Sequence, residues 1–441
     1  MERSEQYPEE EKPRVPLKKN AKTCGTIAED FLESQRANFI DDRLTKWENA
    51  CWARDLCALG HRGINHRMMR VILAVLVCFI SLDLVGADSP HSLPRFTSAK
   101  PGYAYVFPRD HGSHEQFQTE WWYFTGHLLG SESRRFGYEL TFFRRGIDSP
   151  DVWSNPSSWA IRHLYLAHFA LTDEDADQFR FAEKLSRAGI GKAGAKAELL
   201  EVWIDQWHIK AVSPDHQQFQ LQAHAENFSI DLVVESRKPP VIHGAHGVSY
   251  KGQQPDQTSH YYSLTRLHTT GSVEVGDTSM PVEGVSWMDH EFGSGDLAEN
   301  LVGWDWFSLQ LDNNHEIMAY GLRRADSTFD PASSGTMVFP NGDSKAFSLQ
   351  DLQISVNRHW SSPVSGANYP SQWILAIPAE DIELSLSPRM ANQELVTTRS
   401  TRVTYWEGAV DVNGRWKGHD IHGQGYVELT GYAEPYRPSR S

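Results

Sequence analysis

Short runs of alternating apolar and polar residues, divided by turn-forming residues, fill most of the chain after residue 100. Such alternation is typical of β-strands with one buried face, because successive side chains on a strand point to opposite sides. Glu120–Leu129 and Arg135–Arg145 flank a polar Gly-Ser-Glu-Ser turn and predict a β-hairpin. Only Asp173–Arg187 has a pattern that would suit a helix. The sequence therefore predicts an all-β protein of sandwiches or closed barrels.

The length of the chain, 441 residues, suggests two or three domains. Two barrels of roughly eight to ten strands each would use up the roughly 350 residues that follow residue 87. The joint between them is expected at Glu291–Asn300, where glycine, serine and aspartate interrupt the strand pattern. We therefore predict an N-terminal domain at residues 101–291 and a C-terminal domain at residues 292–437. A ligand site is expected where the two domains meet.

The N-terminal part of the chain predicts export. Residues 1–67 are rich in charged residues and are expected to be poorly ordered. The apolar run Val71–Leu82 follows a short basic region, and small residues ending at Ala87 resemble a signal-peptidase site. We predict that residues 68–87 are a signal peptide and that the protein is periplasmic or secreted. The alternative is an uncleaved signal anchor at residues 71–87, although a membrane-spanning helix needs roughly 20 apolar residues.

Cysteine use and net charge limit the chemistry and the partners of the exported chain. All four cysteines precede the expected cleavage site, so the mature protein would have no disulfide bond and no thiol chemistry. The net charge of −15 argues against a nucleic-acid partner and against binding to anionic membrane surfaces. We expect a membrane contact only through an uncleaved N-terminal segment. The cysteines are Cys24, Cys51, Cys57 and Cys78.

The stretch Gly284–Leu311 concentrates tryptophans and carboxylates and is the first candidate for a functional site. Trp287 and Asp289 are two residues apart on a predicted strand and share a face, and Trp304 and Trp306 share a face of the next strand. A carboxylic acid among aromatic rings can donate a proton in a dry pocket. The alternative is a core strand and a polar turn with a hydrogen-bonded aspartate.

A second aromatic run begins at His260, and His260 and Tyr262 also share a face. Pairing this strand with the strand of Trp287 and Asp289 would bring together an imidazole, a phenol, an indole and a carboxyl group. The alternative for His260 is a histidine of the core with all its hydrogen bonds satisfied. A third aromatic run, which starts at Glu120, predicts either a pocket wall or an ordinary half-buried strand.

No glycine-rich phosphate loop and no serine-nucleophile turn is present in the sequence. We therefore expect no cofactor. A metal site needs three or four convergent ligands, whereas neighbours such as Asp289, His290 and Glu291 point to opposite faces of a strand. We expect no metal. The chain also contains two HxxH pairs, His243 with His246 and His419 with His422.

Four segments of these runs resemble the AttH-like family, which is related to hydroxyneurosporene synthase, the carotenoid 1,2-hydratase. The resemblance covers residues 101–435. It implies a fold of two tandem lipocalin-like (calycin-type) β-barrels. The segments are EWWYFTGHL, SHYYSLTRL, GVSWMDHEFGSG and GWDWFSLQLDNNHEIMAYGLRR.

The hydratase branch of this family adds water to a terminal isoprene double bond without a redox cofactor. The resemblance implies that His260 and Asp289 match the acid–base histidine and aspartate of that branch. Tyr262 stands where the branch has tryptophan, and Trp287 stands where it has tyrosine. The AttH-like branch itself is described chiefly as secreted hydrolases or lipocalin-like proteins.

Together these observations predict acid–base catalysis, by hydration or isomerisation, on a double bond of a lipophilic isoprenoid- or carotenoid-like molecule. We expect Asp289 to be the general acid and His260 its partner, with Tyr262 and Trp287 shaping the site. The alternatives are a lipocalin-like carrier of a hydrophobic ligand and, less favoured, a hydrolase. Residues expected to contact the substrate are Glu120, Trp122, Trp304, Trp306, His290 and Glu291.

Overall fold

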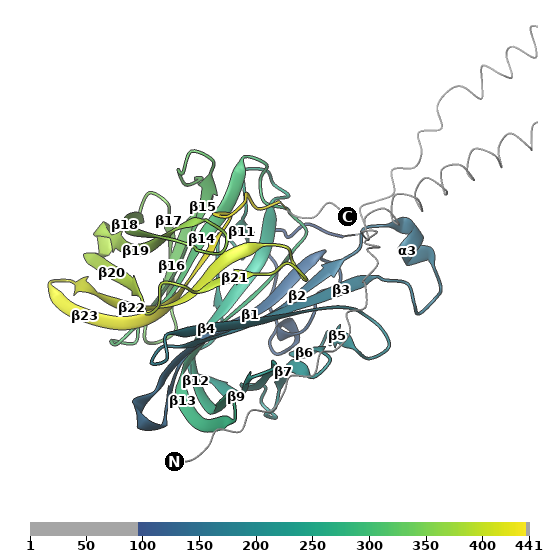
Figure 1. The fold of residues 1–441 in the computed structure, drawn as a ribbon. Coiled ribbons are helices and arrows are strands. Elements are labelled where there is room, and N and C mark those ends of the chain that lie inside the picture. Colours follow the sequence, from purple (N-terminus) through teal and green to yellow (C-terminus); the bar gives the residue numbers. More distant parts are fainter. Residues whose placement is uncertain (1–95, 438–441) are drawn as a thin grey trace, which may run out of the picture. The chain divides into compact units, whose positions relative to one another are not determined.

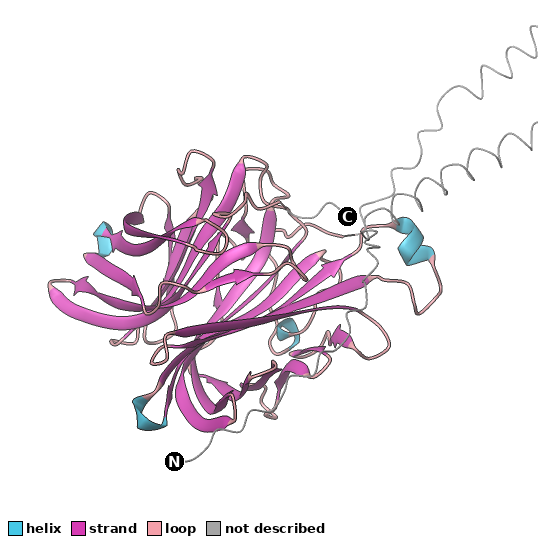
Figure 2. Ribbon diagram, viewed as in Figure 1, coloured by secondary structure: helices cyan, strands magenta, loops and turns pink. Residues whose placement is uncertain are grey.

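The computed structural model describes residues 96–437, and the regular secondary structure of this part is almost entirely β-strand (Figures 1 and 2). The α-helix α3 (Pro150–Ser154) is the longest helical segment in this part of the chain. The predicted all-β fold is therefore confirmed. The N-terminal extension, residues 1–67, and the segment considered for export, residues 68–87, lie outside the described residues. Between residues 96 and 437 there is no helix with the length and apolar character that a membrane crossing requires.

The first sheet has 13 strands and curls into a nearly closed barrel. Its strands follow the order β4-β3-β2-β1-β13-β12-β9-β8-β7-β6-β5, and β10 and β11 pair with β12. The curl brings β3 and β4 into contact with β6. The strands are β1 (Thr119–Gly130), β2 (Arg135–Gly146), β3 (His163–Asp173), β4 (Gln178–Arg187), β5 (Ala193–Ala195), β6 (Glu201–Ile204), β7 (Trp207–Ala211), β8 (Gln218–His224), β9 (Phe228–Ser236), β10 (Val241–Ile242), β11 (Ser249–Tyr250), β12 (Thr258–Val275) and β13 (Thr278–Gly293).

The second sheet has ten strands and curls into a half-barrel, in the order β17-β16-β15-β14-β23-β22-β20-β19-β18, with β21 paired to β22. The chain passes from the first sheet to the second between Gly293 and Leu301. The two curled sheets agree with the predicted tandem lipocalin-like barrels. The strands are β14 (Leu301–Leu311), β15 (Glu316–Arg324), β16 (Ser334–Val338), β17 (Ser344–Ser348), β18 (Gln353–Ser361), β19 (Asn368–Ile377), β20 (Ile382–Pro388), β21 (Glu394–Val396), β22 (Thr404–Trp416) and β23 (His419–Thr430).

Each sheet buries alternate side chains on its concave side, as the period of two residues predicts. Trp122, Phe124 and Met288 belong to the core of the first barrel. Phe307 and Leu309 belong to the core of the second sheet. The opposite faces of the central strands meet each other, because β1 packs on β23 and β2 packs on β22. The central strands are therefore buried on both faces.

The helix predicted at Asp173–Arg187 is wrong. The structure has a turn after Asp173 followed by strand β4, which pairs with β3 along its whole length. Phe179 and Phe181 are two residues apart and pack against Leu395 and Tyr405, which belong to the second sheet. Cross-strand pairing and this contact outweigh the weak helical pattern of the segment.

A buried ion network joins the two sheets. The carboxylate of Glu316 on β15 accepts hydrogen bonds from Nζ of Lys238 at 2.7 Å and from Nε of Arg266 on β12 at 2.5 Å. The hydroxyl of Thr265 donates a third hydrogen bond at 3.1 Å. Glu316 is fully buried, and Lys238 is nearly so. Two cations around one carboxylate thus fix the position of β15 relative to β12.

We predict that Glu316→Gln lowers the free energy of unfolding by about 3 kcal/mol, because the change leaves a nearly buried ammonium group and a partly buried guanidinium group without their anion. Glu380→Gln is the matched control, since Glu380 pairs with the exposed Lys345 and this change should cost less than about 1 kcal/mol. Urea unfolding measures both values. Equal losses in the two variants would show that the network does not stabilise the fold.

Candidate active site

The two sheets face each other through polar and aromatic side chains, although the space between packed sheets is normally filled by apolar ones. The indole of Trp306 donates a hydrogen bond to the hydroxyl of Tyr261 at 3.0 Å. The hydroxyl of Tyr123 donates to the carboxyl of Glu407 at 2.9 Å. Each of these bonds joins one sheet to the other. The layer between the sheets is therefore a hydrogen-bonded network, and we call it the polar layer.

Asp289 lies in the polar layer with its carboxyl group buried, at 4% exposure. Its Oδ1 accepts hydrogen bonds from the indole of Trp287 at 2.7 Å and from the hydroxyl of Ser263. Its Oδ2 accepts a hydrogen bond from the hydroxyl of Tyr261 at 3.0 Å. Among the described residues, Asp289 forms no ion pair. Three neutral donors therefore hold a carboxyl group that lacks a bound cation.

Burial raises the pKa of Asp289 to about 7, and the charge of Glu291 acts in the same direction. The hydrogen bonds from Ser263, Trp287 and Tyr261 oppose this rise, because they favour the charged form. The carboxyl group is thus poised to hold or release its proton near neutral pH. A group in this state can act as a general acid.

Ser263 connects Asp289 to an imidazole. Nε2 of His243 lies 2.6 Å from the hydroxyl oxygen of Ser263, and Nδ1 of His243 lies 3.0 Å from the hydroxyl oxygen of Thr336 on β16. All four side chains are buried. Burial, followed by the charge of Lys251, lowers the pKa of His243 to about 3, so its imidazole is neutral at physiological pH.

Three more acids lie in the polar layer. Burial raises the pKa of Glu139 to about 8 and that of Glu428 to about 7. Burial and then the charge of Glu428 raise the pKa of Glu407 well above its usual range. The indole of Trp304 donates a hydrogen bond to Glu428 at 2.9 Å. The layer therefore favours protonated, uncharged carboxyl groups.

A small cavity lies between the sheets beside Trp287, with room for about one water molecule. Thr125, Ser308 and His127 also line it. Nε2 of His127 donates a hydrogen bond to the backbone oxygen of Gly425 at 2.9 Å, while its Nδ1 has no partner among residues 96–437. Nδ1 of His127 is thus a free hydrogen-bond acceptor within this part of the chain, and a water molecule bound in the cavity would donate to it.

The structure does not bring His260 and Tyr262 to Asp289. The prediction that these two side chains meet Trp287 and Asp289 is therefore wrong. In the pairing of β12 with β13, Ser263 lies opposite Asp289 and Tyr262 lies opposite His290. Residues opposite each other share a face, so Tyr262 and His260 point into the first barrel. Tyr261 and Ser263 lie in the polar layer instead. A register shifted by one residue would point every side chain of the strand to the other face.

His260 instead packs its ring on Tyr103, with ring centres 4.4 Å apart, and its Nδ1 lies 3.0 Å from the backbone oxygen of Gly247. Burial lowers its pKa. The hydroxyl of Tyr262 lies 2.7 Å from Nδ1 of His111. Both side chains thus fit the alternative considered for His260, a core position with satisfied hydrogen bonds.

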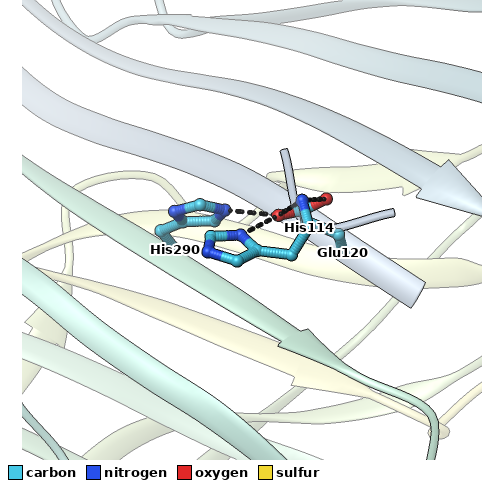
Figure 3. Close-up of side chains that lie close together, drawn as sticks. All are labelled: His114, Glu120 and His290. Atoms are coloured by element: carbon cyan, nitrogen blue, oxygen red, sulfur yellow. Dashed lines mark hydrogen bonds and ion pairs between the residues drawn. The ribbon is translucent and has the colours of Figure 1, made fainter. Parts of the chain in front are cut away.

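Glu120 and His290 belong to a second cluster, inside the first barrel, together with His114 (Figure 3). Oε1 of Glu120 lies 2.8 Å from Nδ1 of His114 and 3.0 Å from Nε2 of His290. Its Oε2 accepts a hydrogen bond from Nε of Arg144 at 2.9 Å. Trp122 stacks on His290, with ring centres 5.0 Å apart. None of these side chains faces the polar layer.

The donor atoms of His114, Glu120 and His290 lie within 4.8 Å of one another, so this cluster is the set of described residues best able to hold a metal ion. However, the carboxylate of Glu120 already binds the buried guanidinium of Arg144 and both imidazoles. Burial alone would raise the pKa of Glu120, but Arg144 and the imidazoles hold it well below its usual range. The cluster is a charge-balanced hydrogen-bond network and does not resemble an open metal site.

The remaining sequence-predicted residues lie in or beside the polar layer. Glu291 pairs with Lys251 at 2.6 Å and accepts a hydrogen bond from Ser259. Trp306 packs its ring edge-on against Trp287, with centres 6.3 Å apart. Trp304 reaches Glu428, as described above.

Sequence reasoning missed several residues of the polar layer. Tyr261 and Ser263 alternate with His260 and Tyr262, so only the register distinguishes the two sets. His243 was considered only as part of an HxxH pair, and its contact with Ser263 depends on the loop after β10. Tyr123 and Glu139 lie on the neighbouring strands β1 and β2, whereas Glu407 lies on β22, and no local pattern connects it with them.

We predict that Asp289→Asn changes how stability depends on pH. Folded Asp289 keeps its proton up to about pH 7, whereas an unfolded aspartate loses it near pH 4. Its contribution to stability is therefore present below pH 4 and is lost as the pH rises to 7. Relative to the wild type, the variant should gain up to about 4 kcal/mol between pH 4 and pH 8. Urea unfolding across this range measures the difference, and a constant difference would contradict the raised pKa.

Comparison with known proteins agrees with this fold. The sequence pattern of the AttH-like family matches residues 98–432. An AttH protein of known structure from Nitrosomonas europaea is 30% identical, with a TM-score of 0.68, and the match covers 76% of this chain and 100% of that one. A kievitone hydratase from Nectria haematococca shares the fold at 16% identity and a TM-score of 0.59, over 77% of this chain and 98% of that one.

No curated protein matches the chain at a significant level in sequence. The family pattern nevertheless covers most of the chain, and the Nitrosomonas europaea protein is matched over its whole length. The predicted resemblance is thereby confirmed: the chain is a member of the AttH-like family.

Proposed function

We propose that the protein is a hydratase- or isomerase-type enzyme that acts by acid–base catalysis on a carbon–carbon double bond of a lipophilic, isoprenoid-like molecule. One observation carries this proposal: the carboxyl group of Asp289 is buried among aromatic rings, with a pKa near 7 and no paired cation among the described residues. Asp289 is the general acid. This role agrees with the role that the family resemblance implies for it.

The reaction begins with the transfer of a proton from Asp289 to one carbon of the double bond, which leaves a carbocation on the other carbon. The acid must be protonated at working pH for this step, and burial provides that condition. In hydration, water then adds to the cation, and the proton that the water releases returns to the Asp289 carboxylate. In isomerisation, the carboxylate instead removes a proton from a neighbouring carbon.

The surroundings of Asp289 suit a positively charged intermediate. The rings of Trp287, Trp306 and Tyr123 lie on the same side of the sheet as the carboxyl group. Aromatic faces attract cations, by about 2 kcal/mol or more when water is excluded. Tyr261 stabilises the carboxylate that remains after proton transfer, because its hydroxyl donates to Oδ2. The same rings offer an apolar surface to a hydrophobic substrate.

The likeness to kievitone hydratase supports the proposal at the level of the fold, because that fold accommodates a hydratase. The activity expected for this chain rests on Asp289. From the hydratase branch of the family, we carry over only the type of reaction, which is the addition of water to a double bond.

The hydrogen bonds around Ser263 argue against the hydrolase alternative. In a serine hydrolase, the carboxylate binds the histidine nitrogen that faces away from the serine. Here Asp289 binds Ser263 itself, and Thr336 occupies the other nitrogen of His243. Ser263 is also fully buried. The hydroxyl of Ser263 thus holds the carboxyl group of Asp289 and is not exposed as a nucleophile.

A lipophilic substrate needs more room than the small cavity beside Trp287, since ligand pockets have volumes of roughly 300 Å³ or more. Binding therefore requires aromatic side chains of the polar layer to move. Trp287 and Trp306 would change their surroundings, so tryptophan fluorescence offers a measure of binding that does not depend on turnover.

We predict that Asp289→Asn lowers the turnover number by a factor of about 10² to 10⁴, while binding measured by tryptophan fluorescence changes little. In the wild type, the turnover number should fall as the pH rises through about 7, because the acid loses its proton. A screen of isoprenoid alkenes followed by mass spectrometry provides the activity assay. Binding without turnover in the wild type would favour the carrier alternative.

Adjacent tyrosines provide a matched pair that locates the site. Tyr261→Phe removes a hydrogen bond to Asp289, and we expect it to lower the turnover number about tenfold, the effect of one hydrogen bond of about 1.4 kcal/mol. Tyr262→Phe makes the same change on the opposite face and should leave the turnover number within about twofold. The reverse order of effects would place the site inside the first barrel.

A further inference from the structure

We propose that His243 is a positioning residue that relays protons to Asp289 through Ser263, and that its imidazole exchanges tautomers when Asp289 gains or loses its proton. This inference rests on the proposed role of Asp289 as the general acid. It assigns a function to a histidine that neither touches the proposed reaction centre nor matches a residue of the family motif.

The relay consists of three side chains from separate parts of the chain. His243 follows β10, Ser263 lies on β12, and Thr336 lies on β16 of the second sheet. Nε2 of His243 is 2.6 Å from the hydroxyl oxygen of Ser263, whose other contact is Oδ1 of Asp289. Nδ1 of His243 is 3.0 Å from the hydroxyl oxygen of Thr336. All of these groups are less than 5% exposed, so water does not compete for the hydrogen bonds.

The directions of the hydrogen bonds depend on the charge of Asp289. When the carboxylate is ionised, Ser263 donates to it, Nε2–H of His243 donates to Ser263, and Thr336 donates to Nδ1. When Asp289 carries a proton on Oδ1, it donates to Ser263, Ser263 donates to Nε2, and Nδ1–H donates to Thr336. Each arrangement satisfies every group, and the imidazole is neutral in both.

The change from the first arrangement to the second amounts to the transfer of one proton along the relay. When Thr336 passes its hydroxyl proton to Nδ1 and takes a proton from the solvent in exchange, Nε2 can release its proton to Ser263, and Ser263 passes its own hydroxyl proton to Asp289. One proton enters at Nδ1 and one arrives at Asp289, and the imidazole ends neutral. The relay thus gives Asp289 a second route by which to gain or lose its proton, besides the direct return from water or substrate.

The charges around the relay favour a change of tautomer over a change of charge. The ammonium group of Lys251 opposes protonation of His243, and burial acts in the same direction. Lys251 keeps its own charge: burial is the largest single influence and lowers its pKa, but Glu291, Tyr320 and Asp289 together raise it by more. The titratable groups that face Asp289 or its partners are Tyr123 from β1, Tyr261 from β12, Glu291 from β13, Tyr320 from β15, Glu407 from β22, Glu428 from β23 and Lys251 from the loop after β11.

Nitrogen-15 NMR of histidine side chains tests the proposal, because the two neutral tautomers have different ring-nitrogen shifts. Between pH 5 and pH 9, His243 should change from the Nδ1–H form to the Nε2–H form, with the same midpoint as the Asp289 carboxyl group. Asp289→Asn should abolish this change. Ser263→Ala should uncouple the imidazole from the carboxyl group.

His168 provides a matched control in the same spectra. Its Nε2 lies 2.8 Å from Ser400, which in turn donates to Glu183, and its Nδ1 lies 2.6 Å from the hydroxyl oxygen of Tyr405. Glu183 also accepts hydrogen bonds from the backbone N–H groups of Arg399 and Ser400, which remain donors at every pH. The tautomer of His168 should therefore stay constant over the same range.

A single tautomer of His243 from pH 5 to pH 9, or its conversion to imidazolium, would overturn the proposal. So would a tautomer change that survives Asp289→Asn. Because the spectra need no substrate, these outcomes are independent of whether the protein turns over an alkene. If the enzyme assay succeeds, His243→Gln should reduce the turnover number about tenfold with little change in KM and should increase the solvent isotope effect, whereas a purely structural role would leave the isotope effect unchanged.

Discussion

Every polar group buried between the two sheets needs a hydrogen-bonding partner, and this requirement shapes the site. The sheets meet through tyrosines, tryptophans and carboxyl groups, and some of these groups find their partners on the opposite sheet, as Tyr123 with Glu407 and Tyr261 with Trp306 show. The same bonds hold the sheets together and fix the reacting groups. A change at one of these residues is therefore expected to affect stability and chemistry together.

The two buried carboxyl clusters of the first sheet illustrate opposite uses of burial. Glu120 is surrounded by Arg144 and two imidazoles and remains charged, so it fastens the segment before β1 to the barrel. Asp289 lies on the other face of the same sheet with neutral donors only, and its pKa rises. Only the second arrangement leaves a proton available near neutral pH. Both carboxyl groups are buried, so the presence or absence of a paired cation decides whether the group has a structural role or can donate a proton.

Much of this organisation could be predicted from the sequence. The period of two residues identified the strands, and it placed Trp287 with Asp289 on one face and Trp304 with Trp306 on another, as the structure shows. Phe307 and Leu309 alternate with these tryptophans and lie in the core of the second sheet, as the same period requires. The expectation of a buried carboxyl group beside an indole also depended only on neighbours along one strand.

The rest of the site depends on pairing between strands, which the sequence does not encode locally. Nothing in the run His260–Ser263 distinguishes the register observed from one shifted by a residue, and that shift decides whether Tyr261 or Tyr262 meets Asp289. The contacts of His243 with Ser263 and Thr336 span two sheets and a loop. The strand β4 was mistaken for a helix for the same reason, because its partners lie on β3 and on the second sheet.

The measurement that tests this account most directly is the titration of the Asp289 carboxyl carbon in the folded wild-type protein. Carbon-13 NMR can follow this carbon, and Asp289→Asn identifies its signal. A midpoint near pH 7 is expected if the carboxyl group lies buried between the sheets without a paired cation. A midpoint near pH 4, the ordinary value for an exposed aspartate, would mean that Asp289 is ionised at neutral pH and cannot serve as the proton donor.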